Sequence, residues 1–94
     1  MEYPNKETVI NTFEYLPDNI RKKVSLKQVS AVLRYENLFY DLEAFSDQAY
    51  ITFSAVCQYI RTELNYEGMI ISLAVVKAIL EAEKEYLREI GLTY

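Results

Sequence analysis

The chain of 94 residues contains no histidine and no tryptophan, and Cys57 is its single cysteine. Without histidine it cannot form a di-iron site of the helical-bundle type, which requires Glu-x-x-His motifs, and no histidine can activate Cys57 as a nucleophile. One cysteine also excludes an intrachain disulfide, which fits a reducing compartment. Because a glycine-rich phosphate loop and a metal-ligand cluster are missing as well, the sequence predicts no enzyme activity, no catalytic residues, no cofactor and no metal site.

Glycine and proline are also scarce, with two residues of each. So few turn formers argue against a turn-rich all-β fold, and a hydrophobic content of 51% argues against a disordered chain. The longest apolar run, "MIISLAVV", is far shorter than the ~20 residues of a membrane-spanning helix, and the N-terminus lacks the pattern of a secretion signal. The composition therefore predicts one soluble, cytoplasmic helical domain over residues 1–94, with no membrane partner.

Capping residues and proline mark the first two helices. Asn5 can cap a first helix, which Pro17 closes, and "PDNIRKK" follows as a connector that can hold one helical turn. Ser25, with Gln28 three residues later, has the spacing of a capping box at the start of a second helix. This second helix is expected to run to about residue 45.

The remaining chain has room for two more helices. Ser46 and Asp47 either cap a third helix or mark a bend in one long helix, and both possibilities stay open. The stretch "NYEG" is the clearest break in the chain, after which Ser72 caps a fourth helix and Gly91 ends it. The apolar stripes at helical spacing, which we expect in the core, are Val9, Ile10, Phe13 and Leu16; Leu26, Val29, Leu33 and Tyr40; Phe53, Val56 or Cys57, Ile60 and Leu64; and Leu73, Val76, Leu80, Leu87 and Ile90.

The chain contains an approximate repeat. An offset of 47 residues places Ser25 on Ser72, Leu26 on Leu73 and Glu36 on Glu83, with connectors of matched length. Amphipathic helices share apolar spacing in any case, so a true duplication and a chance likeness both remain open. One helical hairpin cannot bury its stripe alone, so two similar hairpins, residues 5–45 and 47–92, predict a compact all-α bundle of four helices.

Glu36 and Glu83 each fall in line with an apolar stripe. A carboxylate removed from water is costly unless it is paired, hydrogen-bonded or protonated. One hypothesis is that these seam carboxylates form a polar centre where two helices cross, facing each other or binding a cation. The other is that each lies at the wet edge of its stripe. The edge is the commoner position for a helical glutamate, and we expect it for at least one of the two.

Nine tyrosines and four phenylalanines are many for a chain of this length. Tyr35 and Phe39 are neighbours on one helical face, whereas Tyr40 points about 100° away from them. One helix cannot hide both directions in a single-sided core, and tyrosine is favoured at protein interfaces. We therefore expect a homodimer through the second helix, with Tyr35, Phe39 and Tyr40 in its interface.

Charge is unevenly distributed along a chain whose net charge is −4. Residues 1–35 carry a net charge of +2 and residues 36–94 a net charge of −6. The stretch "RKKVSLK" places Arg21, Lys22, Lys23 and Lys27 around a helix N-terminus, where cations oppose the macrodipole. They are candidates for anion or nucleic-acid contacts, or they form a solvated connector. The acidic remainder would repel nucleic acid, which is therefore a disfavoured partner.

Two parts of the sequence resemble segments of known proteins. The end "ILEAEKEYLREIGL" resembles the C-terminal helices of small proteins carried by prophages and other mobile elements of Gram-positive bacteria. That resemblance, over about the last quarter of the chain, implies a cytoplasmic accessory or host-interaction role. The helix-connector-capped-helix unit also looks like the dimerisation hairpin of HU-type histone-like proteins. The basic β-arms that grip DNA are absent here, so DNA binding does not transfer.

Together these features predict a small acidic interaction module that binds a protein partner, associates with itself, and has a phage accessory or host-factor-binding role. The first alternative is a nucleic-acid-associated or transcriptional regulator that uses Arg21, Lys22, Lys23 and Lys27. The second alternative is a helical bundle that binds a metal or a small ligand through its seam carboxylates.

Overall fold

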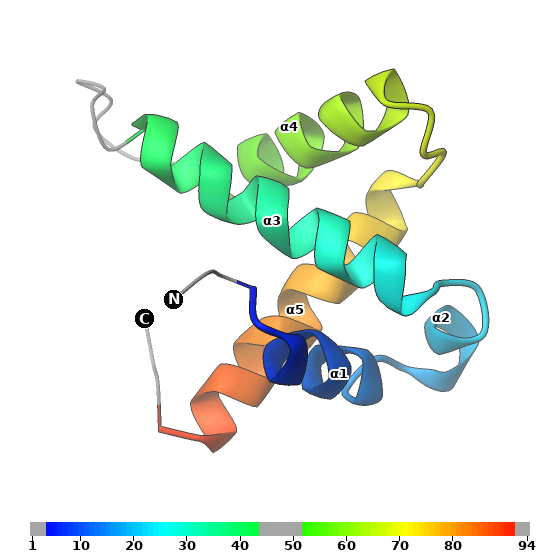
Figure 1. Ribbon diagram of the computed structural model, residues 1–94, viewed down its shortest axis with the longest axis vertical. Helices are drawn as coiled ribbons and strands as arrows, with labels where there is room; N and C mark the ends of the chain where they lie inside the picture. The colour runs from blue at the N-terminus through cyan, green and yellow to red at the C-terminus, as the bar shows by residue number, and fades with distance from the viewer. Residues whose placement is uncertain (1–3, 44–51, 92–94) are drawn as a thin grey trace.

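The structure of the protein, a computed structural model, describes residues 4–43 and 52–91. These residues form five helices and no strand, so the prediction of an all-α bundle is confirmed (Figure 1). The helices are α1 (Lys6–Glu14), α2 (Asp18–Arg21), α3 (Leu26–Glu43), α4 (Phe53–Tyr66) and α5 (Leu73–Glu89). The single turn expected in the first connector is α2.

Side-chain caps fix the starts of three helices where the sequence predicts them. The Asn5 side chain accepts a hydrogen bond from the backbone N–H of Thr8 at 2.8 Å. Ser25 and Gln28 form a reciprocal capping box, because each side chain accepts from the backbone N–H of the other, at 3.2 and 2.9 Å. The Ser72 hydroxyl accepts from a backbone N–H one turn into α5. These bonds satisfy amides that have no partner within a helix.

Glycines end α4 and α5 where the sequence places the breaks. Gly68 has φ of 95° and Gly91 has φ of 84°, a left-handed conformation that other residues adopt only at a cost. After Gly68 the backbone N–H of Met69 donates to the carbonyl of Leu64 at 2.9 Å, which is the bond of a Schellman motif. The chain therefore reverses sharply into α5.

The start of the third long helix differs from the expectation. Thr52 is its cap, since the threonine side chain accepts from the backbone N–H of Ala55 at 3.1 Å, and α4 begins at the next residue. A cap at Ser46 or Asp47 is therefore wrong for this helix. One long helix that continues into α4 is also wrong, because Thr52 has an extended backbone directly before α4. Ser46 and Asp47 themselves lie outside the described residues.

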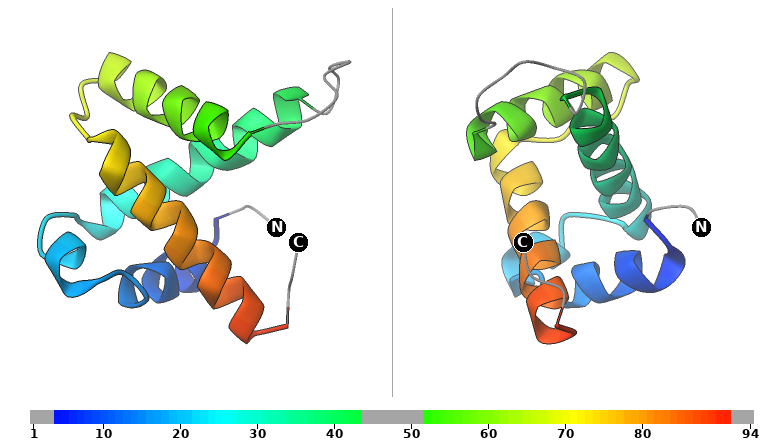
Figure 2. Two further views of the ribbon diagram at one scale, coloured as in Figure 1. Left: turned by 180° about the vertical axis from the view of Figure 1, so that it is seen from behind. Right: turned by 90° about the vertical axis from the view of Figure 1, so that its left-hand side faces the viewer.

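The two longest helices, α3 and α5, cross at the centre of the molecule, with α1 and α4 on opposite sides of the crossing (Figure 2). Each of the two central helices packs against the other and against both flanking helices. The offset of 47 carries the start of α1 onto that of α4, and the start of α3 onto that of α5. Each packed pair then has a counterpart, so the two hairpins are related by an approximate twofold axis through the crossing.

The core lies where α3 and α5 cross. Equivalent positions on the two helices are buried together, because the twofold arrangement places each helix in the same surroundings. These buried residues are Val29, Val32 and Leu33 on α3 and Val76, Ile79 and Leu80 on α5. Leu16, Ile60 and Leu64 extend the same core toward the flanking helices.

Several stripe positions expected in the core are exposed instead. Figure 2 shows that α3 and α5 diverge on both sides of their crossing, so the ends of these two helices lie away from it. The exposed stripe residues are Ile10, Leu26, Tyr40, Phe53 and Ile90, each between 39% and 51% exposed. On α1 the buried face includes Thr8 and Thr12 in place of Ile10.

Thr12 gives a test of this packing. Its side chain is fully buried, and its hydroxyl has no hydrogen-bond partner among the described residues. Valine has nearly the same shape and no hydroxyl to desolvate, so Thr12→Val should raise the free energy of unfolding by about 1 kcal/mol. Urea unfolding measures the change. A variant less stable than wild type would contradict the burial of an unsatisfied hydroxyl at this position. The exposed Thr62→Val is the matched control and should stay within about 0.5 kcal/mol of wild type.

Candidate functional site

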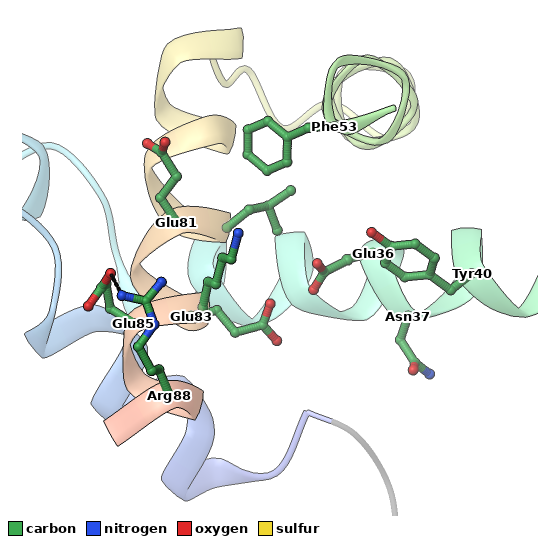
Figure 3. A pocket seen from close by; sticks show the side chains of 10 residues that line it. Glu36, Asn37, Tyr40, Phe53, Glu81, Glu83, Glu85 and Arg88 are labelled. Carbon is green, nitrogen blue, oxygen red and sulfur yellow. Dashed lines mark ion pairs between the residues drawn. The ribbon is translucent and has the colours of Figure 1, made fainter. Parts of the chain in front are cut away.

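An open pocket of about 1070 Å³ lies between the C-terminal half of α3, the first turn of α4, and α5 (Figure 3). It forms on the side where α3 and α5 diverge after crossing. Ten residues line it: Glu36, Asn37, Tyr40, Phe53, Leu80, Glu81, Glu83, Lys84, Glu85 and Arg88. The pocket thus combines an apolar wall with an unusual number of carboxylates.

Glu36 and Glu83 enter the pocket from the two central helices. Figure 3 shows their carboxylates directed toward one another across it. Glu83 is 2% exposed and therefore does not lie at a wet edge, because three helices pack against α5. Glu36, at the equivalent position of the other hairpin, is half-buried. The two side chains therefore face the same pocket, and Glu83 is the more deeply buried of the two.

Burial changes the protonation of both carboxyls. Removal from water raises the pKa of Glu83 from 4.5 to about 7, and it raises the pKa of Glu36 from 4.5 to about 7 as well. The charged form is disfavoured because the protein interior solvates it poorly. The cation of Arg88 at the rim is paired with Glu85, with 3.1 Å between Nη1 and Oε1. Both carboxyls therefore keep their protons to a higher pH than an exposed glutamate does.

The apolar wall of the pocket includes Tyr40, Phe53 and Leu80. Leu80 is buried, whereas Tyr40 and Phe53 remain nearly half exposed. The Tyr40 ring packs edge-on against Phe39, with 5.8 Å between the ring centroids. Burial, and secondarily the nearby Glu36, raises the pKa of the Tyr40 phenol. Aromatic side chains that stay exposed beside a hollow are typical of binding surfaces.

The three aromatic interface candidates have different surroundings. Tyr35 and Phe39 are half-buried and pack against Tyr59 of α4, with centroid distances of 6.4 and 5.1 Å. They therefore contribute to the contact between α3 and α4 within one molecule. Of the three, Tyr40 alone is exposed and available to a partner.

The basic stretch does not gather into one site. The guanidinium of Arg21 forms ion pairs with Asp18 and Glu14, and it also donates to the Glu14 backbone carbonyl at 3.1 Å. Arg21 thereby closes the end of α1. Lys22 and Lys23 are exposed.

Lys27 lies elsewhere, at a smaller pocket of about 410 Å³ between α1 and α3 that Lys6 also lines. The capping box of Ser25 and Gln28 already satisfies two amides at the start of α3. An anion would therefore find fewer free donors at this helix end than the sequence suggests.

Other chemistry finds little support in the described part of the chain. Cys57 is buried, and burial raises the pKa of its thiol, which disfavours the reactive thiolate. Within residues 4–43 and 52–91, no group of three or more metal-ligating side chains could hold an ion. None of the helices in these ranges is long and apolar enough to cross a membrane.

Sequence reasoning identified Glu36, Glu83 and Tyr40 but did not place them in one pocket, and it assigned Phe53 and Leu80 to the core. The pocket depends on the angle at which α3 and α5 cross, for which helical periodicity gives no signal.

Comparisons with models of protein families, with curated proteins and with solved structures found no match.

The two raised pKa values predict how stability depends on pH. A carboxyl whose pKa is higher in the folded protein stabilises it while protonated, because the unfolded chain then binds fewer protons. This contribution to the free energy of unfolding should fall as pH rises from 4.5, the ordinary pKa, to about 7, and level off above that value. Glu83→Gln removes the ionisable group, so at pH 8 it should stabilise the protein by about 1–3 kcal/mol.

Urea unfolding of wild type and variant at pH 5 and pH 8 measures the difference. The matched control is Glu81→Gln, an exposed glutamate on the same pocket, which should change stability by less than about 0.5 kcal/mol. A Glu83→Gln protein that is less stable than wild type at pH 8 would show that the carboxylate is favourably solvated.

Proposed function

We propose that the protein is an interaction module that binds a partner protein through the pocket between α3 and α5. A basic side chain of the partner would enter between Glu36 and Glu83. The observation that carries this proposal is the combination, in one open pocket, of the buried carboxyl of Glu83 and the half-buried carboxyl of Glu36 with the exposed rings of Tyr40 and Phe53.

The charge of the pocket favours a basic group. Four glutamates line it against Lys84 and Arg88, and Arg88 is paired with Glu85. Residues 36–94, which include the whole lining of the pocket, carry a net charge of −6. A field of one sign attracts partners of the opposite sign and orients them as they approach.

A guanidinium or ammonium group would also solvate the two carboxylates, which burial removes from water. Charge-assisted hydrogen bonds to Glu36 and Glu83 would stabilise their ionised forms and lower both pKa values. The hydrocarbon part of an arginine or lysine side chain can pack on apolar surface, here Tyr40 and Phe53. The pocket volume of about 1070 Å³ slightly exceeds the roughly 300–1,000 Å³ of small-molecule sites, which leaves room for neighbouring side chains of a peptide.

Short peptides test this proposal with a matched pair of probes. One peptide carries arginine between two leucines in a glycine-serine sequence, and the other carries citrulline, a neutral isostere, in place of the arginine. The arginine peptide should shift the backbone amide signals of Asn37, Tyr40 and Lys84 in a titration followed by nuclear magnetic resonance. The citrulline peptide should bind at least about tenfold more weakly, because it loses the charge-assisted bonds.

Variants assign the effect to the two carboxylates. Glu36→Gln and Glu83→Gln should each weaken binding of the arginine peptide about tenfold, or by about 1.4 kcal/mol. Glu67→Gln, at the far end of α4 from Phe53, makes the same charge change and should leave binding unchanged. Equal binding of both peptides, or shifts centred on Lys6 and Lys27 at the smaller pocket, would contradict the proposal.

We also propose that the protein associates with itself through α3, which leaves Leu38 and Tyr40 exposed. Light scattering at high micromolar concentration should report a dimer, and Tyr40→Ala should weaken it by about 2 kcal/mol if Tyr40 is a hot spot. Phe39→Ala should instead lower the free energy of unfolding, because Phe39 packs on Tyr59 within one molecule. A monomer at this concentration would contradict self-association.

A further inference from the structure

The α4–α5 turn, residues 66–70, holds two large apolar side chains in solvent. Tyr66 is 90% exposed and Ile70 is 80% exposed, the highest values among the large apolar side chains that the structure describes. The backbone of the turn is fixed by its Schellman motif and by a hydrogen bond from the backbone N–H of Ile71 to the Asn65 side chain at 3.3 Å. A fixed backbone lowers the entropy that these side chains lose on binding.

The hairpin does not require apolar residues at these two positions. The offset of 47 carries Tyr66 onto Asn19 and Ile70 onto Lys23, and both of these polar residues are exposed in the connector between α1 and α3. That connector also leads into a capped helix. Apolar side chains that the fold neither buries nor requires are typical of a contact surface.

The charge around the α4–α5 turn is negative. Between Arg61 and Lys77 the chain carries Glu63 and Glu67 and no basic residue. Glu67 is exposed and directly follows Tyr66, and Glu63 lies one helical turn earlier on α4. A surface that receives this turn should therefore be apolar and should carry cations at its rim.

The smaller pocket, of about 410 Å³ between α1 and α3, has these properties. Its apolar lining includes Val9, Ile10 and Leu26, of which Ile10 is 39% exposed and Leu26 is 46% exposed. Its charged residues are Lys6 and Lys27, both exposed, and none of the described residues that line it is acidic. The pocket therefore matches the α4–α5 turn in apolar character and is opposite to it in charge.

The turn and the smaller pocket do not meet within one molecule. No residue of the turn lines the pocket, and Figure 1 and Figure 2 show the turn beyond the end of α4, with α1 on the other side of the crossing. We propose that the α4–α5 turn of one molecule docks in the smaller pocket of a second copy. The apolar side chains of the turn pack on Ile10 and Leu26, and its glutamates face Lys6 and Lys27.

This contact joins two different surfaces, so each copy in a pair keeps one free turn or one free pocket, and the association is head-to-tail. It is separate from the proposed association through Leu38 and Tyr40, and it does not involve the pocket between α3 and α5. Because few side chains take part, the contact should be weak and should be measured at millimolar protein concentration.

Two variants that each lack one of the surfaces test the contact. The turn variant, Tyr66→Asn/Ile70→Lys, receives the residues of the first hairpin and keeps its smaller pocket. The pocket variant, Lys6→Glu/Lys27→Glu, reverses the charge of the pocket and keeps its turn. Both lysines lie in the first turn of a helix, where the dipole favours acidic residues, so the pocket variant should fold.

The isotope-labelled turn variant is observed by nuclear magnetic resonance while the unlabelled pocket variant is added. The amide signals of Lys6, Ile10 and Lys27 in the labelled protein should shift, because this mixture pairs an intact pocket with an intact turn. Unlabelled turn variant, added instead, should bind at least about tenfold more weakly at these positions. Association through Tyr40 occurs equally in both mixtures and does not affect the comparison.

A matched control changes an apolar side chain elsewhere. Ile90 is 51% exposed, and Ile90→Lys added to the pocket variant should leave the shifts unchanged. The single variants Ile70→Lys and Lys27→Glu, prepared in parallel, should give the same pattern with a smaller difference. The contact is refuted if both unlabelled variants give equal shifts, if neither gives shifts at millimolar concentration, or if the shifts centre on Tyr40.

Discussion

The burial of Glu83 beside Glu36 at the crossing of α3 and α5 is the constraint on which the rest of the structure depends. A carboxylate in poorly solvating surroundings is costly, and both side chains respond with a raised pKa. The apolar contacts of the crossing, with Val29, Val32 and Ile79 fully buried, offset that cost. The same crossing angle that buries the carboxyls also separates the helix ends and creates the pocket.

The two hairpins have the same arrangement of helices but contribute differently to the pocket and to the core. Helix starts, caps and packed pairs correspond at an offset of 47 residues. The correspondence fails near the pocket, where Tyr40 is exposed and the equivalent Leu87 is buried. Glu36 is likewise more exposed than Glu83. The first hairpin therefore supplies a more accessible pocket wall, and the second supplies more of the buried core.

Local rules predicted most of the fold, because caps at Asn5, Ser25 and Ser72 depend on neighbouring residues alone. Thr52 was missed, although the offset of 47 that links Ser25 to Ser72 also carries Asn5 onto it. Helical periodicity named the two glutamates of the site but could not decide their burial, which depends on how four helices pack. For the same reason Phe53 was expected in the core and lies at the mouth of the pocket.

The most direct test of this account is a titration of the glutamate side-chain carboxyl carbons by nuclear magnetic resonance, with Glu36→Gln and Glu83→Gln used to assign the signals. The account predicts that Glu36 and Glu83 titrate near 7, well above the ordinary value of 4.5. Two such late titrations would establish that the crossing holds both carboxyls in poorly solvated positions. If both residues titrate near 4.5, the carboxylates are well solvated in the folded protein, which contradicts their burial at the crossing.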